Sequence, residues 1–264
     1  MFIDTHTHLY TEEFDNDRAE AVKRAVDAGA KALLLPNIDE ASINPMLRMC
    51  KDYAGLCFPM IGLHPTELPE HYEDTLARME AMLQSNHPFI AIGEVGIDLY
   101  WDDSRREDQI AAFRRQIVWS IEHELPLVIH SRKAQREIID TLQPFRHDLQ
   151  GGIFHCFGGT AEEARELLEF EGFYLGIGGV VTFKKSTLPE VLKQCVPLSR
   201  IVVETDSPYL APTPYRGKRN ESCYVPLIID RLAEVYDMPK EQIERQTMAN
   251  TKEIFKKLQN NLAD

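Results

Sequence analysis

Eight short apolar segments recur along the chain at intervals of roughly 30 residues, the spacing of successive strand and helix units. They cover residues 1–4, 31–37, 57–65, 88–96, 125–131, 151–157, 173–179 and 200–208. Their length and their content of Val, Ile, Leu and Phe predict β-strands. The residues that close them are, in order, His8, Asn37, His64, Glu94, His130, His155, Gly178 and Asp206.

Amphipathic stretches separate these segments, with apolar residues near the i, i+3, i+4 spacing of a helix in residues 16–29, 40–53, 70–84, 105–123, 134–142 and 161–170. Strands that alternate with helices are typical of a parallel sheet, and eight such units in about 250 residues are the usual size of a TIM-type barrel. We therefore predict an α/β fold, a TIM-type (β/α)8 barrel, with residues 1–264 as a single domain. A doubly wound open sheet is the alternative, but it needs a glycine-rich turn after the first strand, where this chain has His6 and His8.

The C-terminal region carries a helix-capping pattern. Asn250 is followed three residues later by Glu253 and then by apolar Ile254, Phe255 and Leu258. This order is typical of a helix that begins at Asn250.

Composition excludes several classes of protein. The chain has 29 basic and 42 acidic residues and a net charge of −13, so it lacks the basic field of a nonspecific DNA-coating protein. Its five cysteines are scattered without C-x-x-C spacing, which indicates free thiols in a reducing compartment. No apolar stretch is long enough for a membrane span and no signal-peptide pattern is present, so we expect a cytoplasmic protein. The sequence shows no obvious heptad seam, so we expect a monomer without an obligate protein partner.

Imidazole and carboxylate side chains stand at the predicted strand ends. Side chains at i and i+2 of an extended strand share a face, so His6 and His8 project together. In a barrel, all strand carboxyl ends meet at the face that carries the active site. We therefore expect a metal centre built from His6, His8, Glu94, His130, His155 and Asp206.

Six such ligands are more than one tetrahedral ion requires, which favours two divalent ions. We assign His6, His8, Glu94 and Asp206 to one ion and Glu94, His130 and His155 to the other, with Glu94 as the bridge. Imidazoles suit Zn²⁺ or Mn²⁺, whereas phosphoryl chemistry often uses Mg²⁺. Two ions about 4 Å apart polarise a phosphoryl or acyl oxygen and supply hydroxide near neutral pH.

Further polar residues near these ends have predicted roles. Asp206 is a candidate general base beside its ligand role, and His64 is a candidate to hold a phosphate or protonate a leaving group, or else is structural. Glu204 either orients a ligand histidine or is a buried, paired acid, and Asp98 either supports a ligand or caps the next segment. Cys156 is expected to point away from the site as a small buried hydrophobe.

Basic and aromatic residues follow the same strand ends. The candidates for substrate contact are Arg132, Lys133, Tyr209 and Arg216, whose charges would meet phosphates and whose ring would stack on a base. The alternative for each of the three basic residues is a solvated charge on a loop that does not contact substrate. Trp101 is either a rim aromatic that stacks on substrate or a lid over the core.

The motifs taken together resemble one known family. IDTHTH, GLHP, IGEVGID with YWDD, LPLVIHSR, IFHCFGG, LGIGG, VVETDSPYL and the late ANTKEIF occur in the order found in the TatD family of metal-dependent deoxyribonucleases, among the amidohydrolase-like barrels. The resemblance covers essentially the whole chain and assigns the same six ligands. It implies hydrolysis of DNA phosphodiester bonds by 3′-to-5′ exonuclease activity on single strands. HCFGG stands where many relatives have HCFSG, and GVVTFKK matches only approximately, which affects loop contacts more than metal ligation.

Three hypotheses follow for function. The first is a two-metal nuclease whose partner is single-stranded DNA. The second keeps the metals but changes the substrate to a small amide or ester or to an aminoacyl ester of tRNA, since a fold does not determine a function. The third is a non-enzymatic binding barrel, which would be marked by a missing ligand, and every expected ligand is present.

Overall fold

The computed structural model describes residues 1–84 and 86–258. Its strands are β1 (Phe2–Asp4), β2 (Ala30–Leu35), β3 (Cys57–Pro59), β4 (Ile92–Asp98), β5 (Leu127–Arg132), β6 (Gly152–Phe154), β7 (Phe173–Ile177) and β8 (Ile201–Val203). Its α-helices are α1 (Arg18–Asp27), α2 (Glu40–Asp52), α3 (Tyr72–Leu83), α4 (Arg106–Glu122), α5 (Gln135–Leu142), α6 (Ala161–Leu168), α7 (Leu188–Cys195), α8 (Val225–Tyr236) and α9 (Lys240–Ile254). Short 3₁₀ turns cover Glu12–Phe14, Pro65–Glu67, Gln143–Phe145, Gly179–Thr182, Leu198–Arg200, Ser222–Tyr224 and Lys256–Leu258.

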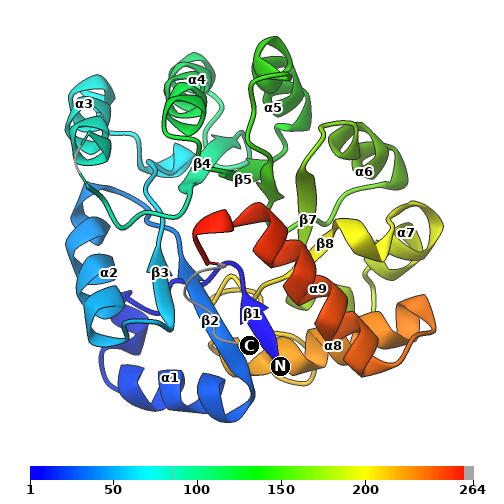
Figure 1. Ribbon diagram of the computed structural model, residues 1–264. Helices are drawn as coiled ribbons and strands as arrows, with labels where there is room; N and C mark the ends of the chain where they lie inside the picture. The colour runs from blue at the N-terminus through cyan, green and yellow to red at the C-terminus, as the bar shows by residue number, and fades with distance from the viewer. Residues whose placement is uncertain (85, 259–264) are drawn as a thin grey trace.

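All strands pair in parallel, β1 to β3 in one run and β4 to β8 in another. Two single bridges join the runs, Ile61 with Ile92 and Thr7 with Ser207. They close the ring, and the helices surround it (Figure 1). The predicted TIM-type (β/α)8 barrel is confirmed, and each expected strand segment and helical stretch overlaps the element found, although β2, β4 and β5 extend one or two residues beyond the expected ranges.

Successive side chains along each strand belong to two apolar layers in turn, one inside the barrel and one between the barrel and the helices. In β2, Ala32 and Leu34 point into the barrel, whereas Leu33 and Leu35 pack against the surrounding helices. This period of two is what a strand buried on both faces requires, and it turns every second side chain at the strand ends toward the barrel axis.

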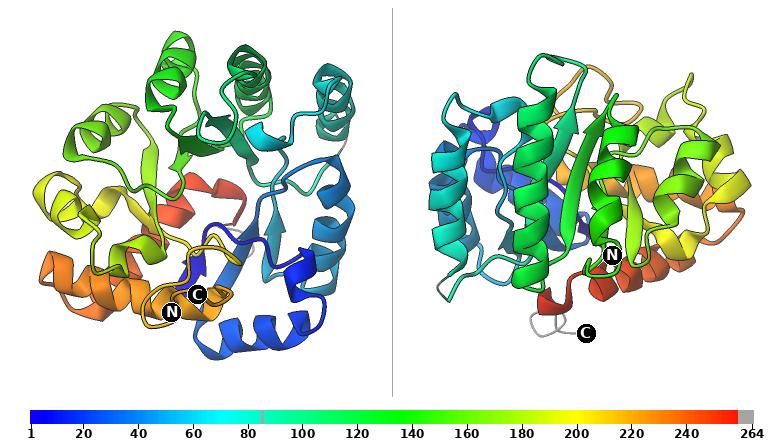
Figure 2. Two further views of the ribbon diagram at one scale, coloured as in Figure 1. Left: turned by 180° about the vertical axis from the view of Figure 1, so that it is seen from behind. Right: turned by 90° about the horizontal axis from the view of Figure 1, so that it is seen from above.

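The prediction of a helix beginning at Asn250 is wrong. Asn250 lies inside α9, and its Nδ2 donates to Leu198 O at 2.9 Å and to Ile201 O at 2.6 Å. The helix covers one end of the barrel (Figures 1 and 2), where Ile254 and Phe255 join the interior cluster. The side chain taken for a cap is instead a tertiary hydrogen-bond donor that joins α9 to β8.

Candidate metal centre

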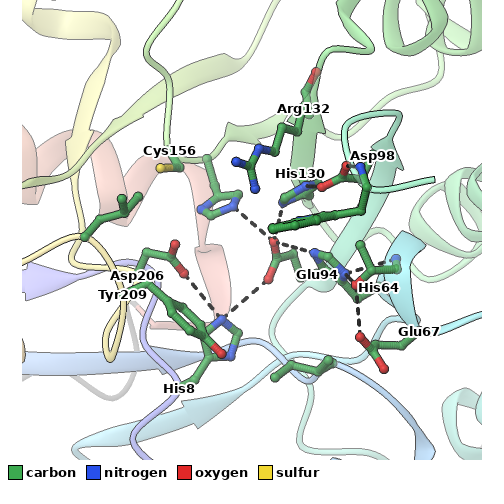
Figure 3. A pocket seen from close by; sticks show the side chains of 16 residues that line it. His8, His64, Glu67, Glu94, Asp98, His130, Arg132, Cys156, Asp206 and Tyr209 are labelled. Atoms are coloured by element: carbon green, nitrogen blue, oxygen red, sulfur yellow. Dashed lines mark hydrogen bonds and ion pairs between the residues drawn. The ribbon is translucent and has the colours of Figure 1, made fainter. Parts of the chain in front are cut away.

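Glu94 lies at the centre of the carboxyl-end face. It is the third residue of β4, and it is only 3% exposed. Its Oε2 lies 3.1 Å from His6 Nε2 and 3.5 Å from His8 Nε2. Its Oε1 lies 3.0 Å from both His130 Nδ1 and His155 Nε2. Each carboxylate oxygen therefore faces different imidazoles, and Figure 3 shows Glu94 between His8 on one side and His64 and His130 on the other.

The first group consists of His6, His8 and Asp206. Asp206 Oδ1 lies 3.7 Å from His6 Nε2 and 3.6 Å from His8 Nε2, and the two imidazole nitrogens are 3.1 Å apart. The histidines are not on an extended strand as expected, because β1 ends at Asp4. Irregular backbone beyond the strands positions them instead: His8 N donates to Ser207 O, and Asp206 N donates to His6 O. The bridge that closes the barrel thus assembles this group.

The second group surrounds Glu94 Oε1 and includes one residue more than the predicted partition. His64 Nε2 lies 3.3 Å from Glu94 Oε1, so His64 joins His130 and His155 there. The backbone N–H of Thr66 donates to His64 Nδ1 at 3.2 Å. The same nitrogen lies 2.7 Å from Thr66 Oγ1. Because Thr66 occupies Nδ1, the nitrogen of His64 that faces Glu94 is Nε2.

The position of the proton on His8 is determined by Tyr10. The Tyr10 hydroxyl donates its single proton to Pro36 O at 2.6 Å, so it must accept from His8 Nδ1, which lies 3.0 Å away. In neutral His8 the proton on Nδ1 leaves a lone pair on Nε2, which faces Glu94 and Asp206. Tyr10 was not among the predicted site residues, and its only signal in the sequence is its place two residues after His8.

His130 and His155 are held in the same way by carboxylates. Asp98 Oδ2 lies 2.9 Å from His130 Nε2, and Glu204 Oε1 lies 3.4 Å from His155 Nδ1. Asp98 and Glu204 thus lie where they can orient a ligand histidine, which was one of the two roles predicted for each. Outer-sphere partners of this kind are typical of metal-binding histidines. Gly176 makes room for Glu204, because a Cβ there would overlap Glu204 Oε2.

The two carboxyl groups of the cluster, those of Glu94 and Asp206, are ionised and are stabilised by positive charge between them. Burial would raise the pKa of Glu94, but the imidazoles of His64 and His155 lower it well below its ordinary value. Burial would also raise the pKa of Asp206, but a hydrogen bond with His8 brings this pKa below its ordinary 3.8. Burial lowers the pKa of His8, yet hydrogen bonds to Asp206 and Glu94 raise it to about 10.

Lone pairs of imidazoles and two ionised carboxylates converge within hydrogen-bond distance, and only protons or cations can hold such a set together. Nitrogen and carboxylate donors suit divalent transition metals. The residues present therefore fit a divalent-metal centre.

A pocket of about 610 Å³ opens above this cluster and is lined by several of the predicted substrate contacts. Arg132 and Tyr209 line it, as do His8, His64 and Asp206 (Figure 3). Its volume is in the range of about 300–1,000 Å³ that is usual for small-molecule sites.

Lys133 and Arg216 are not among the pocket-lining residues. Lys133 Nζ lies 5.1 Å from the Tyr100 ring, and Arg216 Cζ lies 3.5 Å from the Phe183 ring. A contact of either with substrate stays a prediction.

Cys156 differs from expectation in its direction. A φ of 51° places it in the left-handed region, and it lines the same pocket as His155 instead of the opposite face. Burial raises the pKa of its thiol well above the ordinary value. The thiol therefore stays protonated and is a poor nucleophile.

Histidines gathered around a shared glutamate at the carboxyl-end face of a barrel are the arrangement expected of a metal-dependent hydrolase. The family model described as TatD related DNase matches residues 3–256, and the chain belongs to that family, as the motifs indicated. The uncharacterized metal-dependent hydrolase YabD of Bacillus subtilis is 37% identical over 256 residues, which are 97% of this chain and 99% of YabD.

Two further relatives support the family and the fold. The 3′-5′ ssDNA/RNA exonuclease TatD of Cronobacter turicensis is 33% identical, over 96% of this chain and 97% of its own. The crystal structure of YJJV, a TatD homologue from Escherichia coli, superimposes with a TM-score of 0.89 at 27% identity, over 97% of this chain and 98% of that one. In the described residues, no helix is both long and apolar enough to cross a membrane.

Proposed function

We propose that this hydrolase cleaves nucleic-acid phosphodiester bonds, removing nucleotides from the 3′ end of single strands. The observation that carries the proposal is the position of Glu94, whose two oxygens face two separate donor groups. A relative that is 33% identical is named as a 3′-5′ ssDNA/RNA exonuclease, which supports the polarity and the strand type.

Two divalent ions fit the proposal. His6, His8, Asp206 and Glu94 would hold one, and Glu94, His130 and His155 the other. Bound ions of this kind polarise phosphoryl oxygens and lower the pKa of water.

Asp206 is the proposed general base. Its side chain is 16% exposed, against 4% for Glu94, so it borders the pocket where water enters. One carboxylate oxygen faces His6 and His8, which leaves the other to take a proton from the attacking water.

His64 and Arg132 are the proposed phosphate contacts. His64 Nε2 lies 3.3 Å from Glu94 Oε1, and a proton on that nitrogen would donate a hydrogen bond to a phosphoryl or leaving oxygen. The Arg132 guanidinium lies 3.8 Å from the centre of the Tyr100 ring, and no carboxylate of the described residues forms an ion pair with it. Its charge is thus free to meet a phosphate in an otherwise acidic protein.

The test is digestion of 5′-labelled single-stranded DNA, and of RNA in parallel, by metal-stripped protein resupplied with Mg²⁺, Mn²⁺ or Zn²⁺. The expected result is a metal-dependent ladder that shortens from the 3′ end and is absent with Glu94→Gln, which keeps the volume of the side chain. Intact strands with every metal, from protein shown to bind two ions, would contradict the proposal. Such a result would favour amide or ester substrates instead.

A further inference from the structure

Exposed apolar side chains are concentrated at the mouth of the pocket. In the described part of the chain the large exposed ones are Met1, Val26, Tyr100, Trp101, Tyr209 and Leu210. Four of these six form two adjacent pairs, one in the loop after β4 and one in the loop after β8. In a closed ring of eight strands, β4 and β8 lie opposite each other. The two pairs therefore stand on opposite sides of the pocket, which Trp101, Tyr209 and Leu210 line.

Trp101 is exposed yet anchored. Its side chain is 70% exposed, but its backbone N–H donates to Asp98 Oδ1 at 3.3 Å, beside the N–H of Tyr100 at 2.9 Å. The Tyr100 ring packs edge-to-face on it with centroids 4.9 Å apart, and the Arg132 guanidinium lies 5.2 Å from its ring. Asp98 also contacts His130, so the same carboxylate fixes both the ring and the proposed metal ligand.

Tyr209 is fixed in a similar way on the other side. Its N–H donates to Asp206 O at 2.8 Å, and its own carbonyl accepts from Asn220 Nδ2 at 2.6 Å. The side chain is 52% exposed and borders the pocket (Figure 3). Because the backbone of Tyr209 is already ordered, a flat ligand that packs on the ring need only fix the side chain.

A ligand for this pocket must combine a flat apolar ring with an anion. The cationic Arg132 lies against the Tyr100 and Trp101 rings, and the candidate metal centre lies below them. A nucleotide has both features. Bases within a duplex are covered on both faces by their neighbours, whereas a base at an unpaired end has a free face to stack.

We propose that Trp101, with Tyr209 on the opposite wall, binds the unpaired 3′-terminal base of the strand, and so selects single-stranded ends with little regard to sequence. This inference rests on the proposed nuclease function and deepens it. Aromatic stacking is tolerant of sequence because every base has a π face.

The test uses two single-stranded oligonucleotides that differ only at the 3′ terminus, one ending in thymidine and one in an abasic tetrahydrofuran nucleotide. For wild-type protein we expect KM to be roughly 5- to 100-fold higher for the abasic end, as for the loss of one stacked base, with kcat little changed. Trp101→Ala should raise KM for the thymidine end by a similar factor and leave the abasic end unaffected. Trp101→Phe should retain most of the discrimination.

Val26→Ala is the matched control, because Val26 is 47% exposed on α1 and does not line the pocket. It should behave as wild type on both oligonucleotides. Equal effects of Trp101→Ala on the two ends would overturn the stacking proposal while leaving the nuclease function intact.

Binding is measured independently of cleavage by tryptophan fluorescence. The chain has two tryptophans, and Trp119 is fully buried, so quenching by an added oligonucleotide reports on Trp101. If neither oligonucleotide is cut, the nuclease proposal fails, and quenching that is lost in Trp101→Phe would still support the stacking site. Absence of quenching in wild type would reject it.

Discussion

The Tyr10 hydroxyl lies 3.0 Å from His8 Nδ1 and 2.6 Å from Pro36 O, so the direction of the hydrogen bond between Tyr10 and His8 is determined. A carbonyl can only accept; the hydroxyl gives it its proton and receives the one on Nδ1. A residue that was not recognised from the sequence thus decides which nitrogen of His8 faces Glu94.

Tyr10→Phe should weaken metal binding by about 10- to 100-fold, the usual cost of losing such a partner. Affinity is measured by competition with a chromogenic chelator. Tyr236→Phe is the control, because the Tyr236 hydroxyl also donates to a carbonyl, that of Val196 at 2.7 Å, but belongs to α8. Equal affinities in the two variants would contradict the role of Tyr10.

Gly176→Ala should lower both stability and activity. The added Cβ would overlap Glu204 Oε2 and lie 3.1 Å from His155 Cα, and Glu204 is fully buried with nowhere to move. Overpacking of this kind costs about 1–3 kcal/mol of unfolding free energy. Gly158→Ala serves as the control in denaturant unfolding, since a Cβ at Gly158 meets nothing within 4 Å. If Gly176→Ala matched it in stability and turnover, the proposed support of His155 by Glu204 would be wrong.

An ionic network predicts how stability responds to acid. Arg219 contacts Asp17 at 2.7 Å and Glu221 at 2.8 Å, and Arg24 contacts the same two carboxylates. Hydrogen bonding to Arg219 lowers the pKa of Asp17 below its ordinary 3.8. Burial would raise the pKa of Glu221, but hydrogen bonds to Arg24 and Arg219 bring it below its ordinary 4.5.

When folding lowers the pKa of a carboxylate, its contribution to stability is complete at a pH above its pKa in the unfolded chain. The contribution is lost as the pH falls through its pKa in the folded protein. Arg219→Met should therefore lower Tm at pH 7, and this difference from wild type should shrink at pH 3. For a partly exposed pair worth up to about 1 kcal/mol, the loss at pH 7 is about 2–4 °C. The difference in Tm is measured by thermal unfolding in the presence of a chelator at both pH values. Lys23→Met is the control, because Lys23 forms an exposed ion pair with Asp27. A difference from wild type that is the same at pH 3 and pH 7 would rule this account out.

Asn250→Ala should destabilise the fold without changing the chemistry. The Asn250 amide is buried and satisfies two carbonyls, so its loss should cost about 1–3 kcal/mol of unfolding free energy. Because α9 lies at the end of the barrel away from Glu94, kcat/KM per folded molecule should stay at the wild-type value. Asn44→Ala, on the exposed surface of α2, should shift stability by no more than about 0.5 kcal/mol. A drop in kcat/KM in Asn250→Ala would show that α9 is coupled to the site.

The local sequence was sufficient for the barrel and for the residues that meet in its centre. Strand and helix periods are local properties, and parallel strands in a ring bring their carboxyl ends to one face whatever the loops do. His6, Glu94 and His155 could therefore be grouped without coordinates. The family motifs pointed to the same residues, and the family is confirmed.

Tertiary structure alone decided the finer arrangement. The direction of each oxygen of Glu94, the orientation of the His64 ring and the hydroxyl that orients His8 depend on contacts between atoms a few ångströms apart. The bridge between Thr7 and Ser207, 200 positions apart, is made only when the barrel closes. Asn250 is a case in which the local sequence was misleading. Its local pattern is that of a helix cap, but its hydrogen-bond partners come from a distant turn and strand. Periodicity specifies which way a residue faces, whereas the hydrogen bonds that tune it come from segments that meet only in the folded chain.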